Sequence, residues 1–156
     1  MRHTQAVEAG WTLFLDFDGV LNNDGYLRNQ RNHVAVADHR LFDPKNVAAL
    51  NRLCADLPVI RLIITSTWRE GRSVKELQCM LDKEGFAHEG LVAGKTASSG
   101  IRGEEIKSFL ARTEHQRWLI LDDMNLHDHF PEFFFQTSAA AGFTDAMCEM
   151  VLEALR

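Results

Sequence analysis

Short hydrophobic runs alternate along the chain with longer stretches in which apolar residues recur at helical spacing. The runs at residues 11–15, 59–64 and 118–121 predict buried strands, and the shorter runs at 91–92 and 133–135 add two more candidates. Strands that alternate with helices imply a parallel sheet covered on both faces, with right-handed crossovers. The pattern therefore predicts an α/β fold in three layers, built on a doubly wound parallel sheet.

Capping residues mark where the predicted helices begin and end. Asp43 followed by Pro44 is typical of a helix N-terminus, and this helix should end near residues 57–58. Ser73 is the expected cap of a second amphipathic helix, and Gly85 stands where a C-terminal glycine is common. Two more helices are expected, one after the glycine- and serine-rich loop 94–100 and one over residues 145–155.

The segment 22–40 is rich in Asn, Gly, Arg and His and shows no clear periodicity. Its start, Asn23-Asp24-Gly25, has the composition of a turn, so we predict a loop or hairpin that forms a flap. No other interval is long enough for a large inserted cap. We therefore expect one domain over residues 1–156 with a minimal cap.

Composition narrows the class of protein. The chain has 156 residues, of which 46% are hydrophobic, and this suits one globular domain. Its 22 acidic against 17 basic residues mean that the protein as a whole does not attract polyanions. Three widely spaced cysteines and the lack of a secretory apolar segment favour the cytoplasm, and no apolar run approaches the roughly 20 residues of a membrane helix. The oligomeric state stays open.

Polar clusters follow three of the predicted strands. Asp16 and Asp18 come after the first strand, residues 65–67 (Thr-Ser-Thr) after the second, and Asp122 and Asp123 after the fourth. In open α/β sheets ligands bind beyond the carboxyl ends of the strands, so these segments should converge on one edge. The edge is the predicted functional site.

Several carboxylates gathered at one edge cannot all stay ionised unless a cation lies among them. Magnesium prefers oxygen ligands and works with phosphate, whereas zinc would require His and Cys, which are absent from these positions. A carboxylate neutralised in this way can attack phosphorus, and a second acid must protonate the leaving oxygen. Asp16 and Asp18, two residues apart, suit this division of roles, and Gly19 would let the backbone turn close to the metal.

The motif LFLDFDGVLN at residues 13–22 resembles the first motif of the haloacid dehalogenase superfamily, whose fold is Rossmann-like. The resemblance implies that Asp16 is the nucleophile and Asp18 the acid–base residue of a magnesium-dependent phosphatase or phosphotransferase. IITSTWR resembles the second motif and makes Ser66 the phosphate-binding residue, with Thr67 beside it. WLILDD resembles the fourth motif.

By the same resemblance, the fourth motif completes the metal site. Asp122 and Asp123 would bind Mg²⁺ together with Asp16 and the carbonyl of Asp18. The question left open is which of the two acids of the pair is the direct ligand.

The third motif of the superfamily supplies a Lys or Arg for the phosphate. The sequence offers Arg102, Lys95 and Lys107, of which we favour Arg102, in the pattern RGEEI, and keep Lys95 as a further phosphate-binding candidate. The words STWR, RxxEI and LDD, together with Thr96, resemble more narrowly the small haloacid dehalogenase-like domains associated with RNA repair proteins.

A minimal cap leaves the site open to a bulky phosphorylated substrate such as a nucleic-acid end, although small metabolites also fit. Basic residues that could meet additional phosphates lie in the flap and after the second motif: Arg28, Arg31, His33, His39, Arg40, Arg69 and Arg72. The simpler interpretation of these residues is a solvated surface.

Two other interpretations of the chain compete with the phosphatase one. A phosphate or nucleic-acid binding module without catalysis would keep the same fold. Residues 90–96 (GLVAGKT) resemble the phosphate loop of nucleotide triphosphatases, but they lack the four-residue spacing between glycines. His127 and His129 are expected at the surface, and Trp68 and residues 133–135 in the core.

Overall fold

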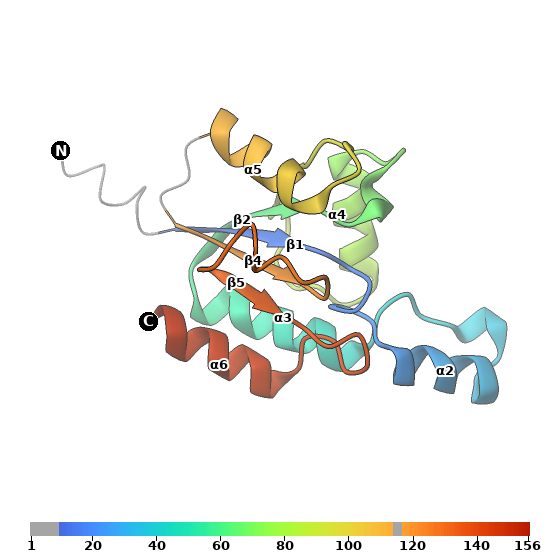
Figure 1. The fold of residues 1–156 in the computed structure, drawn as a ribbon. Coiled ribbons are helices and arrows are strands. Elements are labelled where there is room, and N and C mark those ends of the chain that lie inside the picture. The colour runs from blue at the N-terminus through green and yellow to red at the C-terminus, as the bar shows by residue number, and fades with distance from the viewer. Residues whose placement is uncertain (1–9, 114–116) are drawn as a thin grey trace.

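The computed structural model describes residues 10–113 and 117–156, and in Figure 1 they form a sheet flanked by helices. All neighbouring strands pair in parallel, in the order β3-β2-β1-β4-β5. The strands are β1 (Trp11–Leu15), β2 (Val59–Ile64), β3 (Val92–Lys95), β4 (Trp118–Asp122) and β5 (Phe134–Gln136). The predicted α/β fold with a parallel sheet is confirmed.

Four of the five helices among the described residues begin at a side-chain cap, and the helix that begins at Arg102 does not. The five are α2 (Asp24–His33), α3 (Pro44–Asp56), α4 (Val74–Lys83), α5 (Arg102–Arg112) and α6 (Asp145–Leu155), with short 3₁₀ turns η1 (Val36–Asp38) and η2 (Thr67–Arg69). Asp43 accepts a hydrogen bond from the Lys45 N–H, and Ser73 and Glu76 form a reciprocal capping box. Within the described residues, no helix combines the length and the apolar character needed to cross a bilayer.

Successive residues of the central strands point into two separate cores. Leu13 and Leu15 pack with side chains of α3, α4 and α6, whereas Phe14 packs with Ile106 of α5 on the opposite face. All four side chains are fully buried, which explains why apolar residues follow one another in these strands instead of alternating with polar ones. Figure 1 shows α3 and α6 side by side along one face of the sheet.

The prediction of a loop or hairpin over residues 22–40 was wrong, because this flap contains α2 and η1. Asn23 is a helix cap rather than a turn residue: its side chain accepts a hydrogen bond from the Tyr26 N–H. Gln30 is buried, and its amide pairs with both the N–H and the carbonyl of Arg40. One buried polar side chain thus holds α2 in place of an apolar face. An apolar face would have produced the helical periodicity from which the helix could be predicted.

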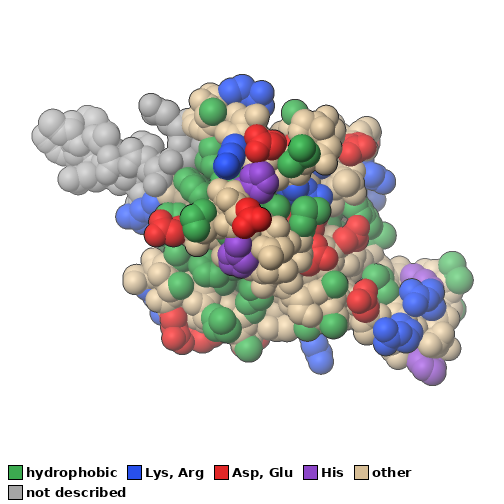
Figure 2. All heavy atoms as spheres, viewed as in Figure 1, with side chains coloured by type: hydrophobic (Ala, Val, Ile, Leu, Met, Phe, Trp, Pro, Cys, Tyr) green, Lys and Arg blue, Asp and Glu red, His purple; other side chains and the backbone are tan. Residues whose placement is uncertain are grey.

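The two ends of the flap meet at its base. The Asp43 N–H donates to the Leu21 carbonyl at 2.8 Å, and Asn23 donates to the carboxylate of Asp43 and the amide of Asn46. From this base α2 protrudes beyond the sheet (Figure 1), and Figure 2 shows basic and His side chains gathered on the protruding part. The two ends of the flap therefore lie side by side, and hydrogen bonds fix them where the flap joins the domain.

Three strands differ in their bounds from the prediction, and one of them is β4, which ends at Asp122 rather than at residue 121. β3 extends to Lys95, so Gly94 and Lys95 belong to the strand and not to the loop that follows it. β5 begins one residue later than expected because Phe133 has a positive φ of 62° and is 42% exposed. A left-handed residue cannot continue a strand, so the chain enters β5 only at Phe134.

Candidate functional site

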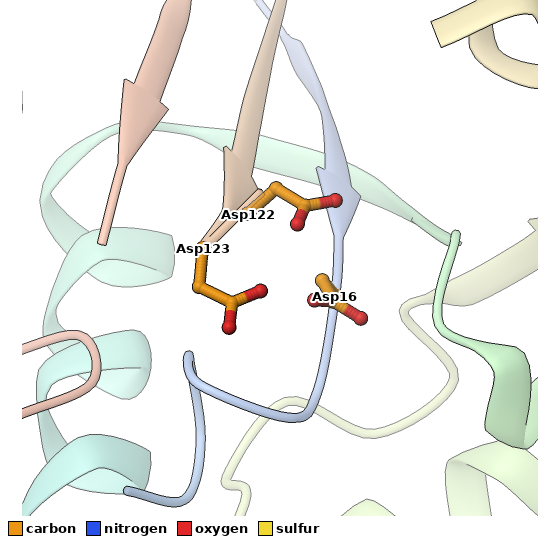
Figure 3. Close-up of side chains that lie close together, drawn as sticks. All are labelled: Asp16, Asp122 and Asp123. Carbon is orange, nitrogen blue, oxygen red and sulfur yellow. The ribbon is translucent and has the colours of Figure 1, made fainter. Parts of the chain in front are cut away.

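Three carboxylates meet at the carboxyl edge of the sheet. β1 and β4 are neighbours with Leu15 opposite Leu121, so Asp16 comes to lie beside Asp122. One carboxylate oxygen from each of Asp16, Asp122 and Asp123 lies within 4.8 Å of the other two. Figure 3 shows the three side chains close together. The convergence expected from the sequence is present, and we call these residues the acidic cluster.

Burial and mutual repulsion oppose the charged forms of these acids. The side chain of Asp16 is nearly enclosed, and burial together with the nearby Asp122 raises its pKa from 3.8 to about 8, against the opposing effect of Arg102. The pKa of Asp123 is raised as well, by burial and by Asp122. Without a cation among these acids, the protonated form of Asp16 is therefore favoured near neutral pH.

Arg102, at the first turn of α5, is the cation that the fold brings to the acidic cluster. Its Nη1 lies 2.6 Å from Asp122 Oδ2 and 3.4 Å from Asp16 Oδ1. Burial acts against its charge, but Asp122, Asp16 and Glu105 outweigh that effect and raise the pKa of Arg102. Of the three basic candidates for the third motif, Arg102 is the one whose ion pairs join it to the cluster.

Lys95 and Lys107 are directed to other partners. The ammonium of Lys95 donates to the backbone carbonyls of Arg69 and Arg72. The ammonium of Lys107 lies 5.9 Å from the ring centre of Phe130. The structure thus does not bring Lys95 to the acidic cluster as a phosphate ligand.

Gly19 is required by the turn that follows Asp16. Its φ is 78°, and a Cβ at this position would overlap the carboxylate of Asp123. Its N–H donates to Asn22 Oδ1, and its carbonyl accepts from the hydroxyl of Thr137 at 2.6 Å. The turn is therefore held on both sides and leaves room for Asp123.

Ser66 and Thr67 follow β2 at the same edge. Ser66 is buried, and its Oγ accepts the Trp68 N–H at 3.2 Å, which caps η2. Thr67 is exposed and, together with Arg102, lines a cavity of about 190 Å³. The structure therefore places both hydroxyl residues beside the strand that carries Asp16, and their phosphate-binding roles remain predictions.

Asp18 lies outside the acidic cluster, and its exposed side chain is held by two donors. Asn22 Nδ2 donates to Asp18 Oδ1 at 2.9 Å, and Trp68 Nε1 donates to Asp18 Oδ2 at 3.0 Å. Because β1 ends at Leu15, the rule that residues two apart on a strand share a face does not extend to Asp18. Trp68 is only half-buried, so the expectation of simple core packing missed this contact.

Arg69 has a role that the sequence did not reveal. The prediction that it could meet substrate phosphates is wrong, because the residue is 2% exposed and its guanidinium is fully engaged. It forms an ion pair with Glu105 at 3.0 Å. It donates to the carbonyls of Thr65, Ser66, Thr96 and Ala97. Arg69 thus joins the segments after β2 and β3 to α5, which carries Arg102.

Glu105 is the other half of this arrangement. Its second carboxylate oxygen accepts the N–H groups of Ser99 and Gly100, and its first lies 3.9 Å from Arg102 Nε. No single-sequence signal distinguishes this buried Arg and Glu from solvated ones, since each stands in a short polar stretch. We call Arg69 and Glu105 the buried ion pair.

The donor set of the acidic cluster fits a hard divalent cation. Its three ligand groups are all carboxylates, and a cation among them would oppose both the burial and the neighbouring Asp122 that raise the pKa of Asp16. The phosphate-loop alternative is not supported. Residues 92–95 form a strand and α5 begins only at Arg102, whereas that loop must lead directly into a helix.

Comparison with known proteins identifies the kind of domain. The family model described as HAD domain in Swiss Army Knife RNA repair proteins matches residues 12–148. No curated protein and no solved structure gives a significant match. The matched range contains the acidic cluster, Ser66 and Arg102.

Removing Arg69 should strongly destabilise the domain. Arg69→Met removes the closer of the two cations beside buried Glu105, leaving Arg102 at 3.9 Å, and it leaves four carbonyls without their donor. We therefore expect a loss of about 3–5 kcal/mol in the free energy of unfolding. Urea unfolding followed by circular dichroism measures this loss. Arg112→Met, an exposed arginine at the end of α5, is the control and should change stability by less than about 1 kcal/mol. Equal effects of the two substitutions would contradict the structural role of Arg69.

The metal-free protein should lose stability relative to Asp16→Asn as pH rises. A folded-state pKa of about 8 against 3.8 means that the folded state binds the Asp16 proton more tightly, so the linked stabilisation is complete below pH 3.8 and lost above pH 8. Asn mimics the protonated acid at every pH. The stability difference between Asp16→Asn and wild type, measured in chelator, should therefore grow from pH 4 to pH 9 and shrink when Mg²⁺ is added. A difference that is independent of pH would contradict the raised pKa.

Proposed function

We propose, from the premise that this chain belongs to the family of HAD domains in Swiss Army Knife RNA repair proteins, that it is a magnesium-dependent phosphohydrolase. In this proposal Asp16 forms an aspartyl phosphate, and the substrate is a phosphorylated nucleic-acid end. The family supports hydrolase chemistry of the phosphatase type. The observation that carries the finer assignment is the position of Asp16 between two further carboxylates and the guanidinium of Arg102.

Asp16, Asp122, Asp123 and the backbone carbonyl of Asp18 are the groups that would hold Mg²⁺. Bound there, the ion would neutralise the cluster and stabilise charge that develops on phosphoryl oxygens. Metal binding would keep Asp16 ionised despite its burial, which is the state a nucleophile requires.

The chain's own groups account for the proton and bond changes. A carboxylate oxygen of Asp16 forms a bond to phosphorus while the bond to the leaving oxygen breaks, and Asp18 gives that oxygen a proton. Water then attacks the phosphorus, Asp18 takes the proton from the water, and inorganic phosphate leaves Asp16. Ser66 and Arg102 would bind the phosphoryl oxygens during both steps.

The open edge and the flap support a nucleic-acid end as the substrate. Arg28 and Arg31 are exposed and three residues apart on α2, so they are neighbours on one face of the helix. The flap carries basic side chains although the chain has a net charge of −5. A phosphate backbone would find positive side chains there despite the acidic balance of the chain as a whole.

Asp16→Asn should abolish magnesium-dependent hydrolysis of 4-nitrophenyl phosphate. Without the nucleophile the aspartyl phosphate cannot form, so we expect kcat to fall at least about a thousandfold. Asp56→Asn at the far end of α3 should keep wild-type activity, because that end lies at the opposite edge of the sheet. If the wild type binds phosphorylated ligands but hydrolyses none of them, the domain is a non-catalytic binding module.

Removing basic side chains from the flap should selectively weaken the binding of nucleic-acid substrates. In Arg28→Ala/Arg31→Ala we expect KM for an oligonucleotide with a terminal phosphate to rise roughly tenfold, with less dependence on salt. Hydrolysis of 4-nitrophenyl phosphate should stay unchanged. Lys75→Ala/Lys83→Ala on α4 removes the same charge elsewhere and is the control. A flap variant that handles the oligonucleotide like the wild type would contradict the proposed substrate class.

A further inference from the structure

Trp68 donates its indole N–H to the carboxylate of Asp18. The distance from Nε1 to Oδ2 is 3.0 Å, and the other oxygen of Asp18 accepts from Asn22 at 2.9 Å. Each carboxylate oxygen therefore has one neutral donor. An exposed carboxylate without such partners would sample several rotamers, whereas these two bonds hold it in one orientation.

The indole ring is itself fixed by its neighbours. It packs against Phe17 at 6.0 Å and Phe42 at 5.8 Å between ring centroids, and both Phe side chains are fully buried. The guanidinium of Arg72 lies 6.0 Å from the ring centre. A ring held by several contacts presents its single N–H in one direction, since indole nitrogen can donate but not accept.

Trp68 also joins the two loops that carry the proposed chemistry. Its backbone N–H donates to Ser66 Oγ, while its side chain contacts Asp18. Ser66 follows β2 and Asp18 follows β1, so one residue links the phosphate-binding candidate to the acid–base candidate. Core packing alone requires neither contact.

We propose that Trp68 is a positioning residue, which orients the carboxyl group of Asp18 for proton transfer to the leaving oxygen. The inference rests on the proposed phosphohydrolase function and deepens it. Asp18 donates its proton as the bond between phosphorus and the leaving oxygen breaks, and it recovers a proton from the attacking water. Trp68 touches neither substrate nor phosphorus and acts only through Asp18.

The dependence of rate on the leaving group tests this role. A 4-nitrophenolate leaves without needing a proton, but the oxygen of an alkyl phosphate must be protonated as it departs. Trp68→Phe keeps an aromatic ring and removes the N–H. We expect kcat/KM to fall about tenfold or more for an alkyl phosphate and less than about threefold for 4-nitrophenyl phosphate, because general acid catalysis contributes only where it is required.

Two further variants separate positioning from packing. Trp118→Phe changes a half-buried indole at the other end of the sheet and should not alter the leaving-group dependence. In an Asp18→Ala background, Trp68→Phe should cause no further selective loss, since its effect passes through Asp18. Equal losses for both substrates, or a full additional loss in the double variant, would overturn the proposal.

A measurement without turnover distinguishes failure of this inference from failure of the proposed function. The indole N–H resonance of Trp68, assigned by its absence in Trp68→Phe, should shift in Asp18→Ala. A resonance that does not move overturns the contact even in an active enzyme. If the wild type hydrolyses no phosphate ester, the proposed function fails and the acid-positioning role fails with it, whatever the resonance shows.

Discussion

The mutual repulsion of three neighbouring carboxylates is the constraint around which the functional edge is built. Asp16 and Asp122 are forced together by the parallel pairing of β1 and β4, and Asp123 is admitted by the absence of a side chain at Gly19. Arg102 lies 3.4 Å from Asp16 and opposes the rise, yet burial and the neighbouring Asp122 outweigh it and raise the pKa of Asp16. A divalent cation bound among the three carboxylates would complete the compensation that Arg102 begins.

Two arginines near this edge perform different tasks. Arg102 reaches the acidic cluster from the first turn of α5, whereas Arg69 is buried with its donors distributed over backbone carbonyls and Glu105. The buried ion pair holds the loops after β2 and β3 against the helix that carries Arg102. The position of Arg102 therefore depends on buried Arg69. The site and the structure that supports it share a single polar network.

The sequence sufficed to predict the fold and the convergence of Asp16, Asp122 and Asp123. Each acid ends an apolar run, and parallel strands bring such ends to one edge whatever the details of packing. It did not suffice for the flap, because α2 is held by the hydrogen bonds between the Gln30 amide and the Arg40 backbone instead of by an apolar face. The hydrogen-bond partners of long side chains could not be predicted from the sequence either. Lys95, for example, donates to backbone carbonyls that only the folded chain brings near it.

The joined base of the flap has a consequence for how this domain can diverge. The hydrogen bond between Asp43 and Leu21 places the entry and exit of the segment together, so its length can change without displacing β1 or α3. Relatives could exchange this module for a shorter or longer one while the chemistry at the sheet edge stays intact. In the proposed function, substrate recognition by the flap and chemistry at the sheet edge thus belong to parts of the chain that can change independently.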